Sequence, residues 1–245
     1  MSAKQRIDQQ PGFVLHSYPY RETSLIVEVF SRDHGRVGLV AKGARRPMSQ
    51  LRGVLMAFQP LFIDWSGGGE MKTLVRAEWQ GGQPLLGGQA LLCAYYLNEL
   101  LMRLLPREDP HPALYRAYGE ALRALAAGEG QEVILRRFEL ALLQELGYGL
   151  QLDSDADGEP VRPELRYVYI IERGAVPLGD HGIDDASVVT GRVLLDMARG
   201  DFREAETLAG AKALMRRLIQ HYLGGQVLQS RRVFTELFAF PGDPS

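Results

Sequence analysis

The chain has 245 residues, of which 46% are hydrophobic and 24% charged, enough apolar material for one large or two small globular domains. The polar start MSAKQRIDQQ lacks a signal-peptide core and the most apolar stretch, LLCAYYLNELLMRLL, contains three polar residues, so we expect a cytoplasmic protein that does not enter a membrane. A single cysteine, Cys93, excludes a disulfide framework and a CxxC metal site, and we expect it to fill the core.

The net charge of −2 conceals a basic N-terminal third. Residues 1–80 contain 11 Lys plus Arg against 7 Asp plus Glu, a net charge of +4, which leaves 17 against 23, or −6, for the remaining residues. The excess gathers in AKGARRPMSQLRG, which contains no acid and follows Arg32 and Arg36. Such clustering is typical of a polyanion-binding surface, although a solvated loop with scattered cations has the same composition.

From residue 12 to about 80 the pattern predicts β-strands. Five short segments are rich in Val, Ile, Leu and aromatic residues: GFVLHSY, TSLIVEVFS, RVGLVAK, PLFIDWS and KTLVRAEW. Asp33–Gly35 is typical of a tight hairpin turn, and Gly67–Gly69 of a loop between the last two strands. Five strands of this length favour a small closed barrel of the OB type, which often binds oligonucleotides. The segment from Pro47 to Ala57 is compatible with a helical turn or with a distorted strand.

After residue 80 the apolar period changes to that of a helix. Helices are expected at ALLCAYYLNELLMRLL, HPALYRAYGEALRALAAG, QEVILRRFELALLQELG, VTGRVLLDMAR, ETLAGAKALMRRLIQHYLGG and SRRVFTELF. Gly147 should end the third of these, and Ser230 should cap the last. We therefore predict an α+β protein, with a five-stranded OB-type barrel over residues 1–80 and an α-helical domain over residues 81–245.

The segment DSDADGEPVRPE, residues 153–164, matches the pattern of a calcium-binding EF-hand loop. An EF-hand needs a helix after the loop, whereas LRYVYIIERGAVPL predicts a β-hairpin. Pro160 and Pro163 also remove two backbone donors. We therefore predict an acidic turn that leads into a β-hairpin insertion at about residues 150–180. Calcium regulation is the alternative, and it requires a stability that changes with a chelator.

Motifs of common enzymes are absent from the sequence. We find no GxSxG elbow, no Walker loop and no GxGxxG at a strand-to-helix turn, and the five histidines are scattered. We predict no catalytic residue and no enzyme.

The order of these segments resembles the RecO family of bacterial recombination and repair mediators. The resemblance rests on GFVLHSYPYRETSLIVEVFSRDHGRVGLVAKGARRP, LRGVLMAFQPLFIDWSG, LNELLMRLL, LRRFELALLQELGYGL and YLGGQVLQSRR, and it runs nearly the whole length. It implies an OB barrel, a helical domain and an insertion that in many members is a four-cysteine zinc site. DSDADG stands where those cysteines would be, so we predict a degenerate zinc-finger region without metal or other cofactor.

The resemblance also implies a function. Members of the family are non-enzymatic mediators of DNA repair and homologous recombination in the RecF pathway, and a nucleoid-associated protein is expected. They bind single- and double-stranded DNA, anneal complementary strands, engage the acidic C-terminal tail of SSB, and cooperate with RecR in loading RecA. A protein-binding adaptor whose basic loop is incidental is the alternative, and its binding should barely respond to salt.

Candidate DNA-binding residues follow from the basic segment. Tyr18, Tyr20 and Phe58 are candidates for base stacking, with the barrel core as the competing interpretation. Arg216, Arg217, Arg231 and Arg232 would extend the DNA track. Phosphate contacts are expected at Arg36, Lys42, Arg45, Arg46 and Arg52.

The resemblance places contact with the SSB tail on the helical domain. Arg136 and Arg137 are the candidates for its carboxylates, and Phe138 would line an apolar pocket. An intramolecular pair between Arg137 and a glutamate is the other interpretation.

Overall fold

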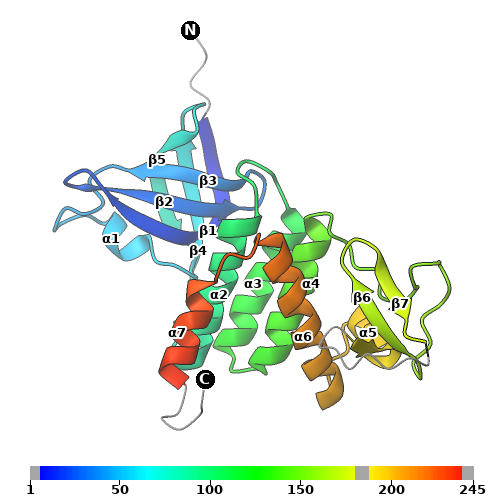
Figure 1. Cartoon of the computed structure of the whole chain (residues 1–245). Coiled ribbons are helices and arrows are strands. Elements are labelled where there is room, and N and C mark those ends of the chain that lie inside the picture. The colour runs from blue at the N-terminus through cyan, green and yellow to red at the C-terminus, as the bar shows by residue number, and fades with distance from the viewer. Residues whose placement is uncertain (1–5, 180–187, 239–245) are drawn as a thin grey trace. The chain divides into compact units, whose positions relative to one another are not determined.

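The computed structural model describes residues 6–179 and 188–238 (Figure 1). The chain forms two compact units, one of residues 1–129 and 228–245, the other of residues 130–227. The first unit is discontinuous because a C-terminal helix returns to it. The predicted division into domains at residue 80 stays a prediction.

The first unit contains a closed five-stranded barrel (blue to cyan in Figure 1). Its strands are β1 (Arg6–Tyr20), β2 (Ser24–Ser31), β3 (Gly35–Ala41), β4 (Pro60–Ser66) and β5 (Met71–Trp79). They close in the order β1-β2-β3-β5-β4, with β3 and β5 parallel and the other pairs antiparallel. Alternate residues face inward, so Val27, Val29 and Leu39 are fully buried in the barrel core. The predicted α+β class with an OB-type barrel is confirmed.

The structure confirms the predicted β2–β3 turn and decides between the two alternatives for the segment from Pro47 to Ala57. The β2–β3 turn ends at Gly35, whose φ of 62° suits glycine. A Cβ there would also lie 2.1 Å from the carbonyl oxygen of Asp109, so no other residue fits. Between β3 and β4 the chain forms a helical turn, α1 (Leu51–Val54), and not a strand. Leu51 and Val54 pack against the barrel core.

Helices α2 (Gly88–Leu104) and α3 (Pro112–Ala126) belong to the same unit. Phe13 and Phe30 point outward from the barrel and pack edge-on against α3, with ring centroids 5.1 Å from Tyr118 and 5.6 Å from Tyr115. Burial raises the pKa of Tyr118 well above its usual value, so its hydroxyl stays protonated and donates to Asn98. Cys93 of α2 is buried, as predicted.

The second unit joins three helices to a small sheet. The helices are α4 (Gln131–Glu145), α5 (Gly191–Arg199) and α6 (Ala205–Tyr222), and the strands are β6 (Arg166–Ile170), β7 (Gly174–Pro177) and β8 (Val188–Thr190), in the order β7-β6-β8. The predicted hairpin is confirmed as β6 and β7. Strand β8 was not predicted: Val189 and Thr190 were expected to belong to the helix at VTGRVLLDMAR, but they end β8, and α5 begins only at Gly191. Gly147, at φ 79°, follows α4 as predicted.

Helix α7 (Gln229–Phe238) begins in a way that the sequence did not predict. Ser230 lies inside the first turn and is not the N-cap. Instead, the carboxylate of Glu99 on α2 accepts the Gln229 and Ser230 amides at 2.9 and 2.8 Å and the Ser230 hydroxyl at 2.7 Å. Burial alone would raise the pKa of Glu99, but these bonds and one from Arg103 lower it. A side chain distant in sequence therefore caps α7 and ties it to α2.

We predict that Glu99→Gln lowers the free energy of unfolding by about 1–2 kcal/mol, because the helix loses its anionic cap. The pKa of Glu99 is lower in the fold than its ordinary value of 4.5, so this stabilisation is complete above that value. It is lost as the pH falls through the lower, folded pKa. Denaturant titrations at pH 7 and below pH 4.5 measure both effects. Glu120→Gln, on the exposed face of α3, is the control; equal stability of the two variants would contradict the prediction.

Candidate nucleic-acid interface

Strand pairing brings the turn after β1 and the segment after β3 to one end of the barrel. Tyr20 pairs with Ser24, and Leu25 pairs with Ala41. Across this junction the Arg45 amide donates to the Thr23 carbonyl at 2.9 Å. The end of the barrel is therefore built by two segments about 20 residues apart in sequence.

Five cations lie at or beside this end, which we call the basic end. Its side chains are exposed: Arg21, Lys42, Arg45, Arg46 and Arg52. Buried Ala44 and successive turns from Gly43 to Arg52 hold the segment in place. Within residues 6–80, every cation outside the basic end is ion-paired, whereas none of these five is. Such a surface has positive charge available for an external polyanion.

Sequence reasoning missed Arg21. It stands alone in PYRET, so no cluster marks it; only the pairing of β1, β2 and β3 brings it to Lys42 and Arg45. Its carbonyl accepts from Arg45 Nη1 at 3.3 Å, and its guanidinium lies 5.1 Å from the Tyr20 ring centroid. The cation–π contact positions Arg21 while leaving it exposed.

Arg36 does not belong to the basic end. Its side chain is only 14% exposed, its Nη1 pairs with Glu28 at 3.3 Å, and its Nε donates to the Leu105 carbonyl at 3.1 Å. Burial lowers its pKa. The guanidinium that we expected to contact phosphate is therefore engaged inside the protein, and a proposal of DNA contacts rests on the other four candidates and Arg21.

The three candidate stacking residues differ in exposure. Tyr18 is 43% exposed and packs edge-on against His16, with ring centroids 4.4 Å apart. Tyr20 is half-buried beside Arg21. Phe58 is buried and packs against Tyr95, so the core interpretation fits Phe58. Only the two tyrosines present ring surface to a ligand.

In the second unit, the three residues expected to bind the SSB tail are not presented together. Phe138 is 2% exposed, and Arg136 is buried in an ion pair with Glu139 at 2.7 Å. Arg137 is exposed, and its Nη2 donates to the Gly200 carbonyl at 3.3 Å. Of the three, Arg137 alone can meet a carboxylate from outside.

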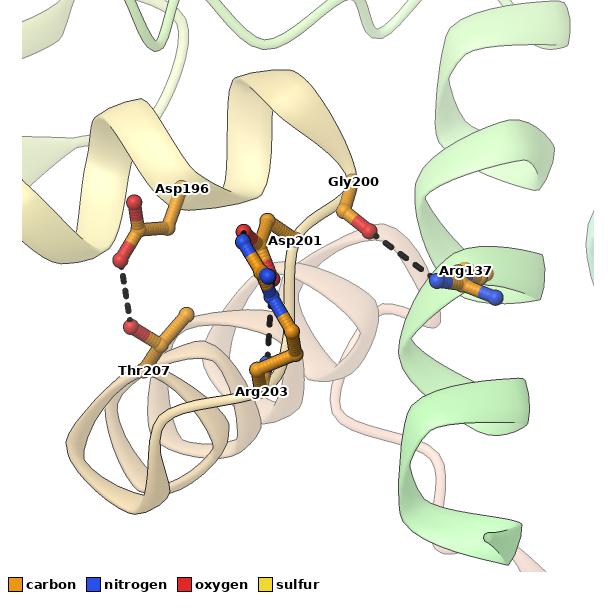
Figure 2. A network of polar contacts seen from close by, with 6 residues as sticks. All are labelled: Arg137, Asp196, Gly200, Asp201, Arg203 and Thr207. Atoms are coloured by element: carbon orange, nitrogen blue, oxygen red, sulfur yellow. Dashed lines mark hydrogen bonds and ion pairs between the residues drawn. The ribbon is translucent and has the colours of Figure 1, made fainter. Parts of the chain in front are cut away.

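Figure 2 shows what surrounds Arg137. Gly200 ends α5 in the left-handed conformation, and Asp201 and Arg203 follow. The Arg203 guanidinium binds both Asp201 oxygens. Hydrogen bonds from Arg203, with a smaller contribution from the charge of Arg137, lower the pKa of Asp201 to about 2. The two arginines thus stabilise the charged form of a carboxylate, here that of Asp201.

The four arginines expected to extend the DNA track are spread over two helices. Arg216 is exposed on α6, and Arg217 donates to the Tyr169 carbonyl at 3.0 Å. Arg231 and Arg232 lie in the first half of α7. The two helices belong to different units, so a continuous track stays a prediction.

The acidic turn in the second unit is held by hydrogen bonds to a carboxylate. Buried Asp155 Oδ1 accepts the amides of Asp157 and Glu159 at 3.0 and 2.9 Å. The Ala156 amide pairs with Ala175 of β7 at 2.7 Å, and Gly158 turns at φ 87°. Asp155 therefore closes the turn through backbone donors, and the next element is β6, not the helix of an EF-hand.

The side chains of this acidic turn do not fit the zinc ion that the family resemblance implies for many members. Zinc favours thiolate and imidazole ligands, whereas the chain has one cysteine, buried Cys93 of α2, whose pKa is raised by burial. Within residues 6–179 and 188–238, no group of three His, Cys, Asp or Glu side chains could hold a metal ion. In the same ranges no helix is long and apolar enough to cross a membrane.

We predict that Asp155→Ala loosens this turn at a cost of about 1–3 kcal/mol, because two backbone amides lose their bonds to a charged acceptor. Hydrogen exchange of the Asp157 and Glu159 amides should accelerate. Asp157→Ala removes an exposed carboxylate from the same turn and serves as the control. Zn²⁺ or Ca²⁺ should leave the melting temperature of the wild-type protein unchanged; a rise with either ion would contradict the assignment.

A closed five-stranded barrel with an exposed basic end, joined to a helical unit, is the architecture of a nucleic-acid-binding OB protein. Comparison with known proteins is more specific. Residues 5–82 match the family model "Recombination protein O N terminal", and residues 87–232 match "Recombination protein O C terminal". The chain belongs to the RecO family, which confirms the resemblance.

Similar proteins cover almost the whole chain. The DNA repair protein RecO of Aromatoleum aromaticum is 68% identical over 97% of this chain and 99% of its own length. Those of an Azoarcus species and Dechloromonas aromatica are 66% and 57% identical, with the same coverage. Family and relatives together support a role in DNA repair and recombination.

Proposed function

We propose that this protein is a non-enzymatic mediator of DNA repair that binds single- and double-stranded DNA and anneals complementary strands. The observation that carries the proposal is the basic end, where all the unpaired cations of residues 6–80 gather. Contacts of Lys42, Arg45 and Arg46 with phosphates would release counterions and bind any sequence. Positive charge between two strands would also reduce the repulsion that opposes their annealing.

We expect the wild-type protein to accelerate annealing of two dye-labelled complementary oligonucleotides coated with SSB, measured by energy transfer between the dyes. Lys42→Glu with Arg45→Glu should abolish most of the acceleration, because two phosphate contacts become repulsive. In the absence of SSB, the same double variant should bind each oligonucleotide at least tenfold more weakly, given about 1.4 kcal/mol per tenfold change.

The matched control is Arg116→Glu with Arg123→Glu, which makes the same charge change on the exposed surface of α3 in the same unit. It should retain annealing. Equal losses in the two double variants would mean that only net charge matters. No acceleration by the wild-type protein at low salt would refute annealing.

We further propose that the second unit binds the acidic C-terminal tail of SSB, and that RecR and RecA act with the protein in recombination. Support for the tail site comes from Arg137, which donates to the Gly200 carbonyl, and from Arg203, which binds the carboxylate of the next residue, Asp201 (Figure 2). A peptide carboxylate would exploit the same guanidinium groups. Arg136 and Phe138 are buried and would contribute indirectly, by holding α4 and thereby Arg137 in position.

Arg137→Glu should weaken binding of an acidic peptide that ends in a free carboxylate after an apolar residue, by roughly tenfold or more, because attraction becomes repulsion. Fluorescence anisotropy of a labelled peptide measures this affinity. Arg173→Glu, in the exposed β6–β7 turn of the same unit, is the control. A peptide that binds both variants as tightly as the wild-type protein would argue against the site.

One observation favours the adaptor alternative. Trp79 at the end of β5 is 58% exposed and Leu85 is 71% exposed, and exposed apolar side chains of this size are typical of protein contacts. The two functions respond differently to salt. DNA affinity that rests on several phosphates falls by orders of magnitude between low and moderate salt, whereas an apolar protein contact changes little.

A further inference from the structure

The outer face of the barrel carries a row of residues that crosses four strands. Residues paired directly across neighbouring strands project from the same face. The row consists of His16 on β1, Glu28 on β2, Gly38 on β3 and Met71 on β5. Glu28 is 2% exposed despite facing outward, so something covers it.

The loop between α2 and α3, residues 105–111, provides this cover (Figure 1). Its backbone pairs with β3, since the Glu108 amide donates to the Arg36 carbonyl at 3.0 Å. The side chain of Arg36 adds a second bond to the loop, since its Nε donates to the Leu105 carbonyl at 3.1 Å. The loop therefore pairs with β3 through its backbone, and this pairing places Arg107 beside the outer face of the barrel.

Arg107 extends over the glycine of the row. A Cβ on Gly38 would lie 2.6 Å from Arg107 Nη1 and 2.9 Å from the Met71 sulfur. Glycine thus leaves the space that the guanidinium occupies. Arg107 Nη2 donates to Glu28, yet the side chain remains 31% exposed.

Two arginines share one carboxylate in this cluster, since Glu28 pairs with both Arg36 and Arg107. The acids that follow Arg107 in the loop contact other side chains, Glu108 with Lys72 and Asp109 with His111. Arg36 is enclosed at 14% exposure, so Arg107 is the guanidinium of the pair that solvent reaches. A cation that is already partly dehydrated and held in place loses little entropy when it binds an anion.

The next row toward the basic end is largely apolar and consists of exposed Tyr18 with half-buried Ile26, Val40 and Thr73. Beyond it lie Tyr20 and Lys42. From Gly38 to Lys42 is four residues, or about 13 Å along a strand. The exposed ring of Tyr18 therefore lies between two cations, Arg107 above Gly38 and Lys42 at the basic end.

We infer that Arg107 is a further nucleic-acid-binding residue, which contacts a phosphate of a single strand whose bases stack on Tyr18. The inference rests on the proposed DNA binding and extends it from the basic end onto the outer face of the barrel. Cations that track the backbone and an aromatic platform between them suit a strand of any sequence. Through this residue the α2–α3 loop, outside the barrel, becomes part of the interface.

The test is the affinity for a dye-labelled oligothymidylate, measured by anisotropy over a range of salt concentrations. Arg107→Ala should weaken binding roughly tenfold at low salt. It should also reduce the slope of log K against log salt by about 0.7, as expected for one lost single-strand phosphate contact. Arg107→Lys should keep the slope. The control, Arg76→Ala, removes an exposed arginine of β5 that pairs with Glu78 and should change neither quantity.

Gly38→Ala provides a second test that removes no charge. The new methyl group should displace the flexible end of Arg107 and weaken binding, and it should add little in the Arg107→Ala background, because both changes act on one contact. Thermal melts report whether each variant folds, and should Arg107→Ala fail to fold, Gly38→Ala decides the matter.

Two failures can be told apart. Wild-type affinity in Arg107→Ala and Gly38→Ala, with binding lost in the Lys42→Glu, Arg45→Glu double variant, would overturn the role of Arg107 and leave DNA binding intact. Absence of salt-dependent binding by the wild-type protein would overturn both.

Discussion

The buried carboxylate of Glu28 is the constraint on which the first unit depends. An ionised group that is 2% exposed needs compensating charge, and removal of a partner from such a group typically costs about 3–5 kcal/mol. Arg36 supplies one partner from the neighbouring strand and Arg107 the other from the α2–α3 loop. Satisfying one side chain therefore attaches this loop to β3. The attachment agrees with the packing of α3, whose Tyr118 covers Phe13 of the barrel.

The elements of the fold were predictable because each leaves a local pattern. Short apolar runs rich in Val, Ile and Leu in β2 and β3, with Gly35 between them, predict a hairpin whatever surrounds it. Contacts between distant segments leave no such pattern. Ser230 has the side chain of an N-cap, yet Glu99, 131 residues earlier, fills that role. Three residues at β8 were too few to show a period, so the third strand of the small sheet went unpredicted.

The candidate site could be predicted only in part, for the same reason. Arg36 and Lys42 lie six residues apart in one basic segment and cannot be ranked by composition, but the loop that covers Arg36 arrives some 70 residues later. Arg136 and Arg137 are adjacent on α4, and one is buried with Glu139 while the other is exposed. A sequence reports how many cations a segment has. It does not report which carboxylates the fold will place beside them.

Charge therefore becomes informative about partners only after internal pairs are set aside. Over residues 6–80 the ion pairs use the cations of the barrel walls and leave those around Lys42 and Arg45 free. A modest net charge of the N-terminal third thus becomes a concentrated positive surface. The unequal pairing at Glu28 adds one partly exposed charge at Arg107. Folding neutralises cations elsewhere and leaves the unpaired ones together, so a protein with a net charge of −2 can still present a basic surface.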